Sequence, residues 1–456
     1  VKDIAALAKA GMNVARLNFS HGTYEHHAKL IRNIHKAEKE TGKRIGILQD
    51  LQGPKIRIGE MPKEGIGLKK DETFTLTTRK ITGKKNNKKI EIPIKYKDLT
   101  KDIKKNDIIL INDGLIESKA TKVTKTGIVC KVKFGGVVKT RHGVNFPTAS
   151  ISTPTITAKD KKDLKFGLKH NVDFVALSFV KSKKDTEQLR DLVKKEKKEA
   201  QIIAKIERHE AVKNLKEIIK ASDGVMVARG DLGSDINAEQ VPIVQKRMIT
   251  LANRYGKPVI TATQVLQSMV KKSKATRAEI SDAANAVFDH TDAIMLSNES
   301  AVGKYPVKAT TTLTKVASTV EKEMQKHEEL LEHIVAPRAL SALSATCLNA
   351  CELAIDTKAD FIAVYTTDGY TARQIAKHRL YIPIITITPD KKAARFLTLV
   401  WGINRVIVKK CSQKDPEKLN EIIKILNKEK ITKKGDKIVI VCNASKKEGL
   451  ISTTKL

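Results

Sequence analysis

Short apolar runs alternate with helical patterns along most of this chain, and this alternation limits the possible folds more than any other feature. Seven such runs stand at residues 13–19, 45–48, 172–180, 200–206, 223–228, 257–263 and 292–296. Helical patterns lie between most of them, for example at 185–199 and 278–288. Strands that alternate with helices predict a parallel α/β sheet. Seven strands approach the eight of a (β/α)8 TIM barrel.

Two further units interrupt or follow this pattern. Residues 59–148 are rich in short strand patterns and poor in helical periods, which predicts an all-β lid domain inserted in a barrel loop. From residue 336 onward strands and helices alternate again, which predicts an open α/β domain at 336–456. The barrel would then consist of 1–58 and 149–335. Three units agree with a length of 456 residues.

The formal net charge of +35 is high. One interpretation is a polyanion partner such as nucleic acid. The other is a lysine-rich solvated surface on an enzyme of phosphorylated substrates. The second is favoured, because the lysines are scattered among acids and no aromatic residues are interleaved to stack bases. A nucleic acid partner is therefore not expected. No apolar run has the length of a membrane span, so a membrane partner is not expected either.

Polar side chains follow the predicted strands of the barrel, at the ends where barrel enzymes place their reactive groups. They are Arg16, Asn18, Ser20 and His21, then Asp50, then Lys205 and Glu207, then Arg229 and Asp231, then Thr261, Thr263 and Gln264, then Ser297 and Glu299. The spacing of two residues predicts that Arg16, Asn18 and Ser20 share one strand face. Asp231 lies in a glycine-rich turn that is expected to open a short helix.

Each of these residues taken singly has a structural explanation. Lys205 and Glu207 could be an ion pair, and Ser20 and His21 could form a turn. Together they place acids, cations and hydroxyls at one end of one barrel, where a stable core needs none of them. No Ser-His-Asp order and no zinc spacing competes with this interpretation.

The residue types agree with one chemistry. Glu207 and Asp231 are hard oxygen ligands that suit Mg²⁺. A phosphoryl group in transfer could be held by the cations Arg16, Arg57 and Lys205. The backbone N–H groups of Gly230 and Asp231, at a helix N-terminus, would bind a carboxylate. A carboxylate, a phosphoryl group and a divalent ion describe a phosphorylated carboxylic acid as substrate.

Five segments that contain these residues resemble the signatures of the pyruvate kinase family. They are GMNVARLNFSHGT at 11–23, IAKIERHEAV at 203–212, SDGVMVARGDLG at 222–233, GKPVITATQVLQSM at 256–269, and residues 276–306. The resemblance spans nearly the whole chain, including the inserted β domain and the C-terminal domain. It implies phosphoryl transfer from phosphoenolpyruvate to ADP, giving pyruvate and ATP, with Mg²⁺ or Mn²⁺.

The resemblance also implies residue roles. Arg16 and Lys205 would bind the moving phosphoryl group, and Glu207 and Asp231 would ligate the divalent ion. Gly230, Asp231 and Thr263 would hold the pyruvate moiety, and Thr263 and Ser297 would lie near the protonated carbon. The residues implied at the nucleotide are Asn18, His21, Arg57, His142 and the lid residue Asp113. At position 142 the family often has lysine, so this assignment departs from the pattern.

The family usually begins with a barrel strand ahead of the first helix, whereas this chain begins inside that helix, at Val1. The first barrel strand is therefore expected to be absent from these residues. A fragment of a longer protein is the favoured explanation, because a barrel that lacks a strand exposes two edges. The resemblance further implies a homotetramer. Because the sequence shows neither a signal-peptide pattern nor a membrane-length apolar run, a cytoplasmic location is expected.

The segment DLQGPKIRIG at 50–59 matches the family version that does not need K⁺, which has lysine after the proline. Asn18, Ser20, Asp50 and Leu51 would form an oxygen pocket for a monovalent cation, and the Lys55 ammonium would replace that cation. The alternative is that Lys55 is an ordinary surface lysine.

The C-terminal segment YTTDGYTARQIAKHR resembles the effector loop of the family, with hydroxyls on Thr366, Thr367 and Thr371. Asp368 adds a negative charge that would oppose a sugar bisphosphate. A second function class stays open, namely a non-catalytic protein that binds a phosphorylated metabolite or nucleic acid on the same scaffold.

Overall fold

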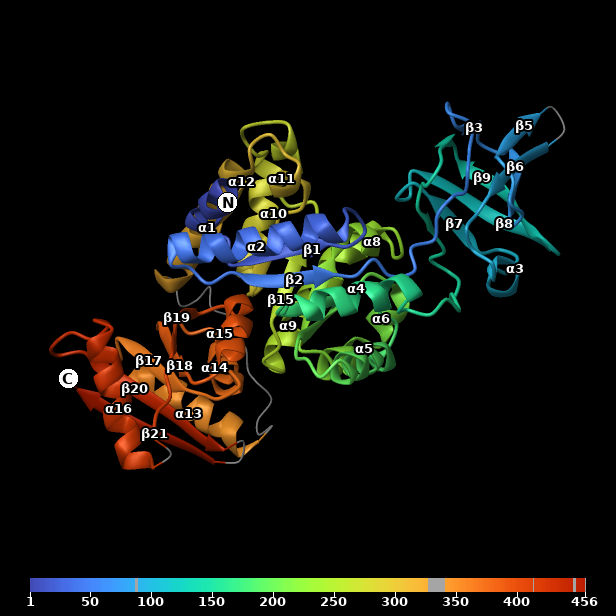
Figure 1. Cartoon of the computed structure of the whole chain (residues 1–456). Coiled ribbons are helices and arrows are strands. Elements are labelled where there is room, and N and C mark those ends of the chain that lie inside the picture. Colours follow the sequence, from blue (N-terminus) through green and yellow to red (C-terminus); the bar gives the residue numbers. More distant parts are fainter. Residues whose placement is uncertain (87–88, 327–340, 413, 446–447, 456) are drawn as a thin grey trace.

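The structure, a computed structural model, describes residues 1–86, 89–326, 341–412, 414–445 and 448–455. Figure 1 shows three units: a central barrel, an inserted β unit that projects from one side, and a C-terminal α/β unit at the opposite side. The inserted unit is called the lid below. The site described later lies at the end of the barrel from which the lid projects.

The barrel sheet has seven parallel strands in the order β1-β2-β12-β13-β14-β15-β16. Their bounds are β1 Val14–Asn18, β2 Gly46–Asp50, β12 Phe174–Leu177, β13 Gln201–Ile206, β14 Gly224–Ala228, β15 Val259–Ala262 and β16 Ala293–Met295. Each lies within one of the seven predicted runs, except that β2 extends to Asp50. In the described part of the chain no ladder joins β16 to β1, so the sheet has seven strands and two edges, as expected for a barrel without its first strand.

Helices and short helical turns alternate with the strands, and the longer helices cover the outer face of this sheet (Figure 1). Their bounds are α1 Lys2–Ala10, α2 Tyr24–Thr41, α4 Ala158–Lys169, α5 Lys183–Lys195, α6 His209–Lys213, α7 Leu215–Ala221, α8 Arg229–Gly233, η1 Ala238–Gln240, α9 Val241–Arg254, η2 Gln267–Val270, α10 Arg277–Phe288, α11 Asn298–Ala301 and α12 Pro306–Lys326. The helices predicted at 185–199 and 278–288 correspond to α5 and α10, and the short helix predicted after β14 is α8.

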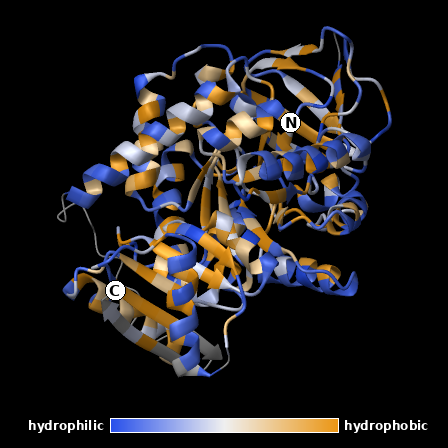
Figure 2. Ribbon diagram, turned by 60° about the vertical axis from the view of Figure 1, so that its left-hand side comes forward, coloured by the Kyte–Doolittle hydropathy of each residue, from blue (hydrophilic) through white to orange (hydrophobic). Residues whose placement is uncertain are grey.

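Helix α2 illustrates why these segments become helices. Thr23 caps its start by accepting the His26 N–H, and Gly42 ends it in the left-handed conformation that glycine adopts without strain. Ile31, Ile34 and Ala37 recur at helical spacing and are buried against the sheet. Figure 2 shows the same division over the molecule, with apolar residues along the strands and hydrophilic residues on the outer faces of the helices.

The lid has its own sheet, in the order β11-β7-β8-β9-β4-β6-β5, and a two-stranded ladder of β3 and β10. Its elements are β3 Ile66–Leu68, β4 Thr73–Thr77, β5 Lys84–Asn86, β6 Lys89–Pro93, α3 Leu99–Asp102, β7 Ile108–Ile111, β8 Ile116–Thr124, β9 Gly127–Phe134, β10 Gly136–Val138 and β11 Val144–Asn145. All of them fall inside 59–148, and the short α3 is the only helix among the lid residues that the structure describes. The domain limits at 59 and 148 stay a prediction.

The C-terminal unit is a five-stranded sheet in the order β19-β18-β17-β20-β21, in which only β21 runs antiparallel. Its elements are α13 Ala342–Asp356, β17 Phe361–Tyr365, α14 Tyr370–Ala376, β18 Ile384–Thr388, α15 Lys391–Phe396, η4 Leu397–Leu399, β19 Ile403–Val408, α16 Asp415–Lys428, β20 Lys437–Ser445 and β21 Glu448–Lys455. The predicted boundary between 335 and 336 lies outside the described residues.

The C-terminal unit docks on the amino ends of the barrel strands through two aspartate–arginine pairs. Asp173 precedes β12, accepts the Ile47 N–H at 2.8 Å and pairs with Arg395 at 2.7 Å. Asp292 precedes β16 and pairs with Arg379 at 2.8 Å. The docking surface is therefore at the opposite end of the strands from their carboxyl ends.

Asp292→Ala is expected to lower the free energy of unfolding by about 3 kcal/mol or more, because it leaves the buried Arg379 guanidinium without its carboxylate. The variant also removes the acceptor for the Val259 and Trp401 N–H groups. Urea unfolding would measure the loss. The matched control is Glu199→Ala, which breaks an exposed pair with Lys392 across the same junction and should change stability by no more than about 0.5 kcal/mol. Equal losses in the two variants would contradict this account of the docking.

Candidate active site

Asp50 is the buried centre of a charged cluster at the carboxyl ends of β1, β2 and β13. Arg16 Nε donates to Asp50 Oδ2 at 2.6 Å, and Lys205 Nζ donates to Asp50 Oδ1 at 3.1 Å. Burial alone would raise the pKa of Asp50, but the Lys205 and Arg16 charges outweigh it and the pKa is lowered. Asp50 therefore stays ionised and orients both cations at this end of the barrel.

Lys205 links this cluster to Glu207 two residues further along the same strand direction. Its Nζ lies 2.9 Å from Glu207 Oε1 and donates to Ser178 Oγ at 2.7 Å. Burial alone would lower the pKa of Lys205, yet the Asp50 and Glu207 carboxylates raise it above its ordinary value. The ammonium thus keeps its charge although its side chain is only 10% exposed.

Glu207 and Asp231 line one hollow between the barrel and the lid. Lys55, Phe179, Arg208 and Asp235 also line it. Glu207 is held by the Phe179 N–H, which donates to Oε2 at 2.7 Å. Burial raises the pKa of Glu207, and Asp231 adds to the rise while Lys205 opposes it. Two carboxylates that repel each other in this way suit a divalent cation, so the residues fit Mg²⁺ or Mn²⁺.

Lys55, the predicted replacement for a monovalent cation, approaches one of these two carboxylates. Its Nζ contacts Asp231 Oδ1 at 3.1 Å. The predicted cation-pocket oxygens have protein partners of their own: Asn18 Oδ1 accepts the Ser20 N–H, and the Leu51 carbonyl accepts the Ser178 hydroxyl. Ser20 lies in the turn after β1 and not on its strand face, so the prediction of one shared face is wrong for this residue.

Thr263 and Gly230 are in direct contact. The Gly230 N–H donates to Thr263 Oγ1 at 2.9 Å, and that hydroxyl donates to the Ala262 carbonyl at 2.7 Å. Thr263 and Gln264 have φ values of 66° and 54°, which are costly for residues with a side chain, above all for a β-branched one. Arg229 maintains this turn by donating to the Thr263 and Gln264 carbonyls, so its role here is structural.

Ser297 directly precedes helix α11 and is tied to the same region through Glu299. Glu299 Oε2 accepts the Ser297 N–H at 2.8 Å, and Oε1 accepts the Leu266 N–H at 3.0 Å. Glu299 is 1% exposed. It therefore links the segment after β16 to the segment after β15, and these segments carry Ser297 and Thr263. Thr261, which was also a candidate, is fully buried and shares a hydrogen bond with Thr291.

The residues expected at a nucleotide divide between two places. Arg57, His142 and Asp113 lie near one another where the lid joins the barrel: Arg57 and Gly143 form a bridge, and Asn112 N–H donates to the Gly143 carbonyl. Burial and Lys139 lower the pKa of His142. Asn18 and His21 lie on the barrel, where the His21 N–H donates to the Asn18 carbonyl at 3.3 Å.

The comparisons with known proteins agree with one another. The family model "Pyruvate kinase, barrel domain" matches residues 1–310, and "Pyruvate kinase, alpha/beta domain" matches 344–456. The chain belongs to the pyruvate kinase family. It is therefore related to phosphotransferases, and all the residues of the site above fall within the first match.

Individual pyruvate kinases are similar over almost the whole chain. A pyruvate kinase of Thermotoga maritima is 39% identical over 99% of this chain and 95% of its own. One of Clostridium acetobutylicum is 40% identical, covering 96% and 92%. A crystal structure of a pyruvate kinase from Cryptosporidium parvum superposes with a TM-score of 0.90 at 34% identity, covering 99% of this chain and 92% of that one.

The effector loop expected from the family resemblance is largely closed in this structure. Thr366 and Thr371 are buried, and only Thr367 is exposed. Thr366 Oγ1 accepts the Gly369 N–H, and Asp368 Oδ1 accepts the Tyr370 N–H. Two N–H groups at the start of α14 are thus already bonded to the loop's own side chains.

Sequence reasoning missed residues that orient the site. Ser178 binds Lys205, and the Phe179 N–H binds Glu207. Both residues directly follow β12, so the expectation that functional residues follow the barrel strands could have identified them. Phe179 has a φ of 57°, a backbone feature that the sequence does not reveal.

None of the helices in the described ranges is both long enough and apolar enough to cross a membrane.

Proposed function

We propose that this member of the pyruvate kinase family transfers the phosphoryl group of phosphoenolpyruvate to ADP, giving pyruvate and ATP. The main support is the Lys205 ammonium, which is buried, charged and held between Asp50 and Glu207. Arg16 stands on the other oxygen of Asp50. Two fixed cations at one point can stabilise the charge that a phosphoryl group develops in transfer, without reorganising when it does so.

The substrate carboxylate would bind at the start of α8. Gly230 and Asp231 supply backbone N–H groups, and Thr263 supplies a hydroxyl that already contacts Gly230. In the complex the carboxylate would take over the Gly230 N–H from Thr263. Thr263 and Ser297 would then flank the carbon of enolpyruvate that receives a proton.

Glu207 and Asp231 would hold the divalent ion, Mg²⁺ or Mn²⁺. Bound there, the ion would neutralise charge on the phosphoryl and carboxylate oxygens of the substrate. Lys55, which contacts the Asp231 carboxylate in this structure, would leave it when Asp231 binds the divalent ion. The nucleotide would lie towards the lid, at Asn18, His21, Arg57, His142 and Asp113.

A coupled assay of pyruvate formation from phosphoenolpyruvate and ADP tests this function directly. The second candidate, a non-catalytic binding protein on the same scaffold, is suggested by the net charge of +35 and the seven-stranded barrel. It would give binding of phosphoenolpyruvate without turnover. A homotetramer is a further proposal that rests on the family resemblance, and a cytoplasmic location is a further proposal that rests on the sequence.

Activity without K⁺ is expected for this enzyme, with Na⁺ or a quaternary ammonium as the only monovalent cation. The reason is that Lys55, once the divalent ion has displaced it from Asp231, would supply a tethered positive charge in place of the monovalent cation and so would need no ion from solution. Lys55→Glu should lower activity in K⁺-free buffer, and added K⁺ should restore part of it.

The control for this experiment is Lys95→Glu, an exposed lid lysine that pairs with Glu60 and should behave as the unchanged enzyme. A K⁺ requirement of the unchanged enzyme for most of its activity would exclude charge replacement by Lys55. The coupled assay itself would still decide whether the chain is a pyruvate kinase.

A further inference from the structure

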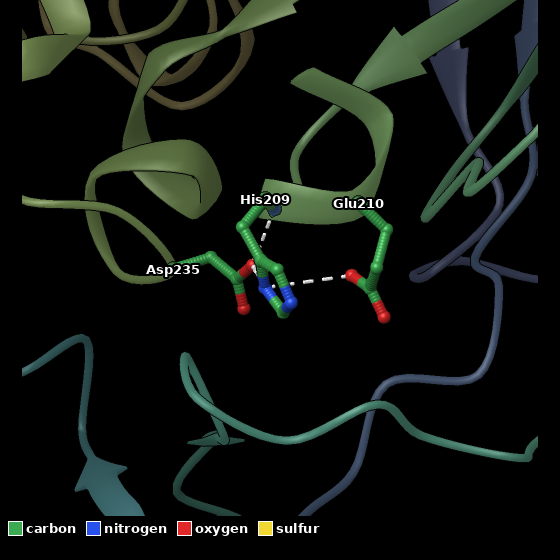
Figure 3. A group of neighbouring side chains, drawn as sticks. All are labelled: His209, Glu210 and Asp235. Carbon is green, nitrogen blue, oxygen red and sulfur yellow. Dashed lines mark hydrogen bonds and ion pairs between the residues drawn. The ribbon is translucent and has the colours of Figure 1, made fainter. Parts of the chain in front are cut away.

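A second cluster of ionisable side chains lies beside the proposed metal ligands and has no role in the function described so far. It consists of His209, Glu210 and Asp235 (Figure 3). His209 and Glu210 stand at the start of α6, and Asp235 follows α8. Asp235 also lines the hollow that contains Glu207 and Asp231.

Asp235 binds His209 twice through one oxygen. Its Oδ2 accepts the backbone N–H of His209 at 2.7 Å and the ring Nδ1–H at 2.9 Å (Figure 3). The Asp235 side chain is only 2% exposed. A buried carboxylate with two donors is a strong contact, because breaking it leaves a desolvated charge without partners.

This contact connects the two segments that carry the proposed metal ligands. Glu207 stands two residues before His209, and Asp231 stands four residues before Asp235. Within the second segment the Asp235 N–H donates to the Leu232 carbonyl at 2.9 Å, so Asp235 is closely tied to α8. The His209–Asp235 contact therefore closes a short ring between the carboxyl ends of β13 and β14.

Such a ring has a clear physical use. Two carboxylates that must share one cation repel each other before the cation arrives. If the two carboxylates were held flexibly, they would move apart. Bringing them together around the ion would then cost free energy, and the affinity for the ion would be lower. A fixed link between their backbones removes that cost, in the way that outer-shell partners orient ligands in metal sites.

We propose that Asp235 is a positioning residue: through both N–H groups of His209 it holds the segment of Glu207 against the segment of Asp231, so that the two carboxylates can bind one divalent ion. The proposal rests on the metal site proposed above.

The same three side chains could instead ligate an ion themselves, since one possible ligand atom of each lies within 4.8 Å of the others. The contacts favour positioning. The His209 nitrogen that faces both acids is the one that donates to Asp235, so it has no lone pair for a metal. Glu210 is paired with Arg208 at 2.9 Å.

The test measures Mn²⁺ binding to the full chain without substrates. The electron paramagnetic resonance signal of free Mn²⁺ reports how much of the ion remains unbound. Asp235→Ala should weaken Mn²⁺ binding by about 10-fold or more, as the loss of an outer-shell partner does in other metal sites. Asp235→Asn keeps an oxygen that can accept both N–H groups and should stay within about 3-fold of the unchanged protein, since the contact is what this proposal requires. In the kinase assay Asp235→Ala should raise the Mg²⁺ concentration for half-maximal rate, while the rate at saturating Mg²⁺ falls much less.

The matched control is Asp223→Ala at the opposite ends of the same two strands. Asp223 also accepts a backbone N–H, from Ile202, and also pairs with a neighbouring side chain, Arg190. It should lower the unfolding midpoint without changing Mn²⁺ affinity. If Asp235→Ala does not fold, His209→Leu removes the ring donor from the other side and should weaken Mn²⁺ binding in the same direction.

Three results would overturn the proposal: Mn²⁺ affinity unchanged in folded Asp235→Ala and His209→Leu, a loss in Asp235→Asn as large as in Asp235→Ala, or a loss as large in Asp223→Ala. Glu207→Gln in the same titration separates these outcomes from failure of the metal site. If Glu207→Gln binds Mn²⁺ normally, the ion lies elsewhere. If it loses Mn²⁺ while Asp235→Ala keeps it, only the positioning role fails.

Discussion

Lys205→Met is expected to lower the turnover number by about 10²–10³-fold or more, the cost of losing one electrostatic donor aimed at the transition state. Phosphoenolpyruvate binding should change much less, because charge on the moving phosphoryl group develops mainly in the transition state. The ammonium is placed for this role by three partners, Asp50, Glu207 and Ser178. Steady-state kinetics and a direct binding measurement would give the two numbers.

The same substitution should also destabilise the fold, because it leaves the buried Asp50 and Glu207 carboxylates without their shared cation. Activity must therefore be measured at a temperature well below the midpoint of thermal unfolding of the variant. Lys257→Met is the matched control. Lys257 is a partly buried lysine at the other end of the barrel, where its Nζ donates to the Ser222 carbonyl. The Lys257→Met variant should have a lower free energy of unfolding but an unchanged turnover number. Normal turnover in Lys205→Met would refute the assignment of Lys205.

Glu207→Gln and Asp231→Asn are each expected to raise the Mg²⁺ concentration for half-maximal activity by at least about tenfold. Outer-shell changes alone weaken metal sites by about 10–100-fold, and these substitutions would neutralise the ligands themselves. The effect should be larger for Glu207, which the Phe179 N–H and Lys205 fix in place. A titration of activity against Mg²⁺, repeated with Mn²⁺, would measure it.

Glu210→Gln is the informative control, since Glu210 is close in sequence to Glu207 but pairs with Arg208. Its metal dependence should equal that of the unchanged enzyme. If Glu207→Gln and Asp231→Asn both kept normal metal dependence and Glu210→Gln did not, the ion would belong to the cluster of His209, Glu210 and Asp235.

Much of the fold could be predicted from the sequence because local patterns were sufficient. The seven strand segments, helices α5 and α10 and the β-rich lid each carry their periodicity within a few residues. The family motifs likewise stand in continuous segments, so Lys205, Glu207, Asp231 and Thr263 could be nominated without a structure. The rule that reactive groups follow strands then placed them at one end of one barrel.

The sequence did not reveal the hydrogen bonds that these side chains form. Ser20 was expected on a strand face, but β1 ends at Asn18, and in the turn that follows the Ser20 N–H donates to Asn18 Oδ1. Lys55 was expected to replace a monovalent cation near Asp50, and this stays a prediction; in the structure Asp50 is bonded to Arg16 and Lys205, and Lys55 contacts Asp231. The two Asp50 oxygens accept from donors on other strands, Arg16 and Lys205, which no local pattern reveals.

The sequence by itself determined the succession of strands and helices and the residue types at the strand ends, because periodicity and residue chemistry are local properties. Only the tertiary structure decided which charges meet. It set Lys205 between two carboxylates, bonded Thr263 to Gly230 and joined His209 to Asp235. The physical reason is that an electrostatic contact depends on the distance between side chains, and that distance is set by how strands distant in sequence pack into one sheet.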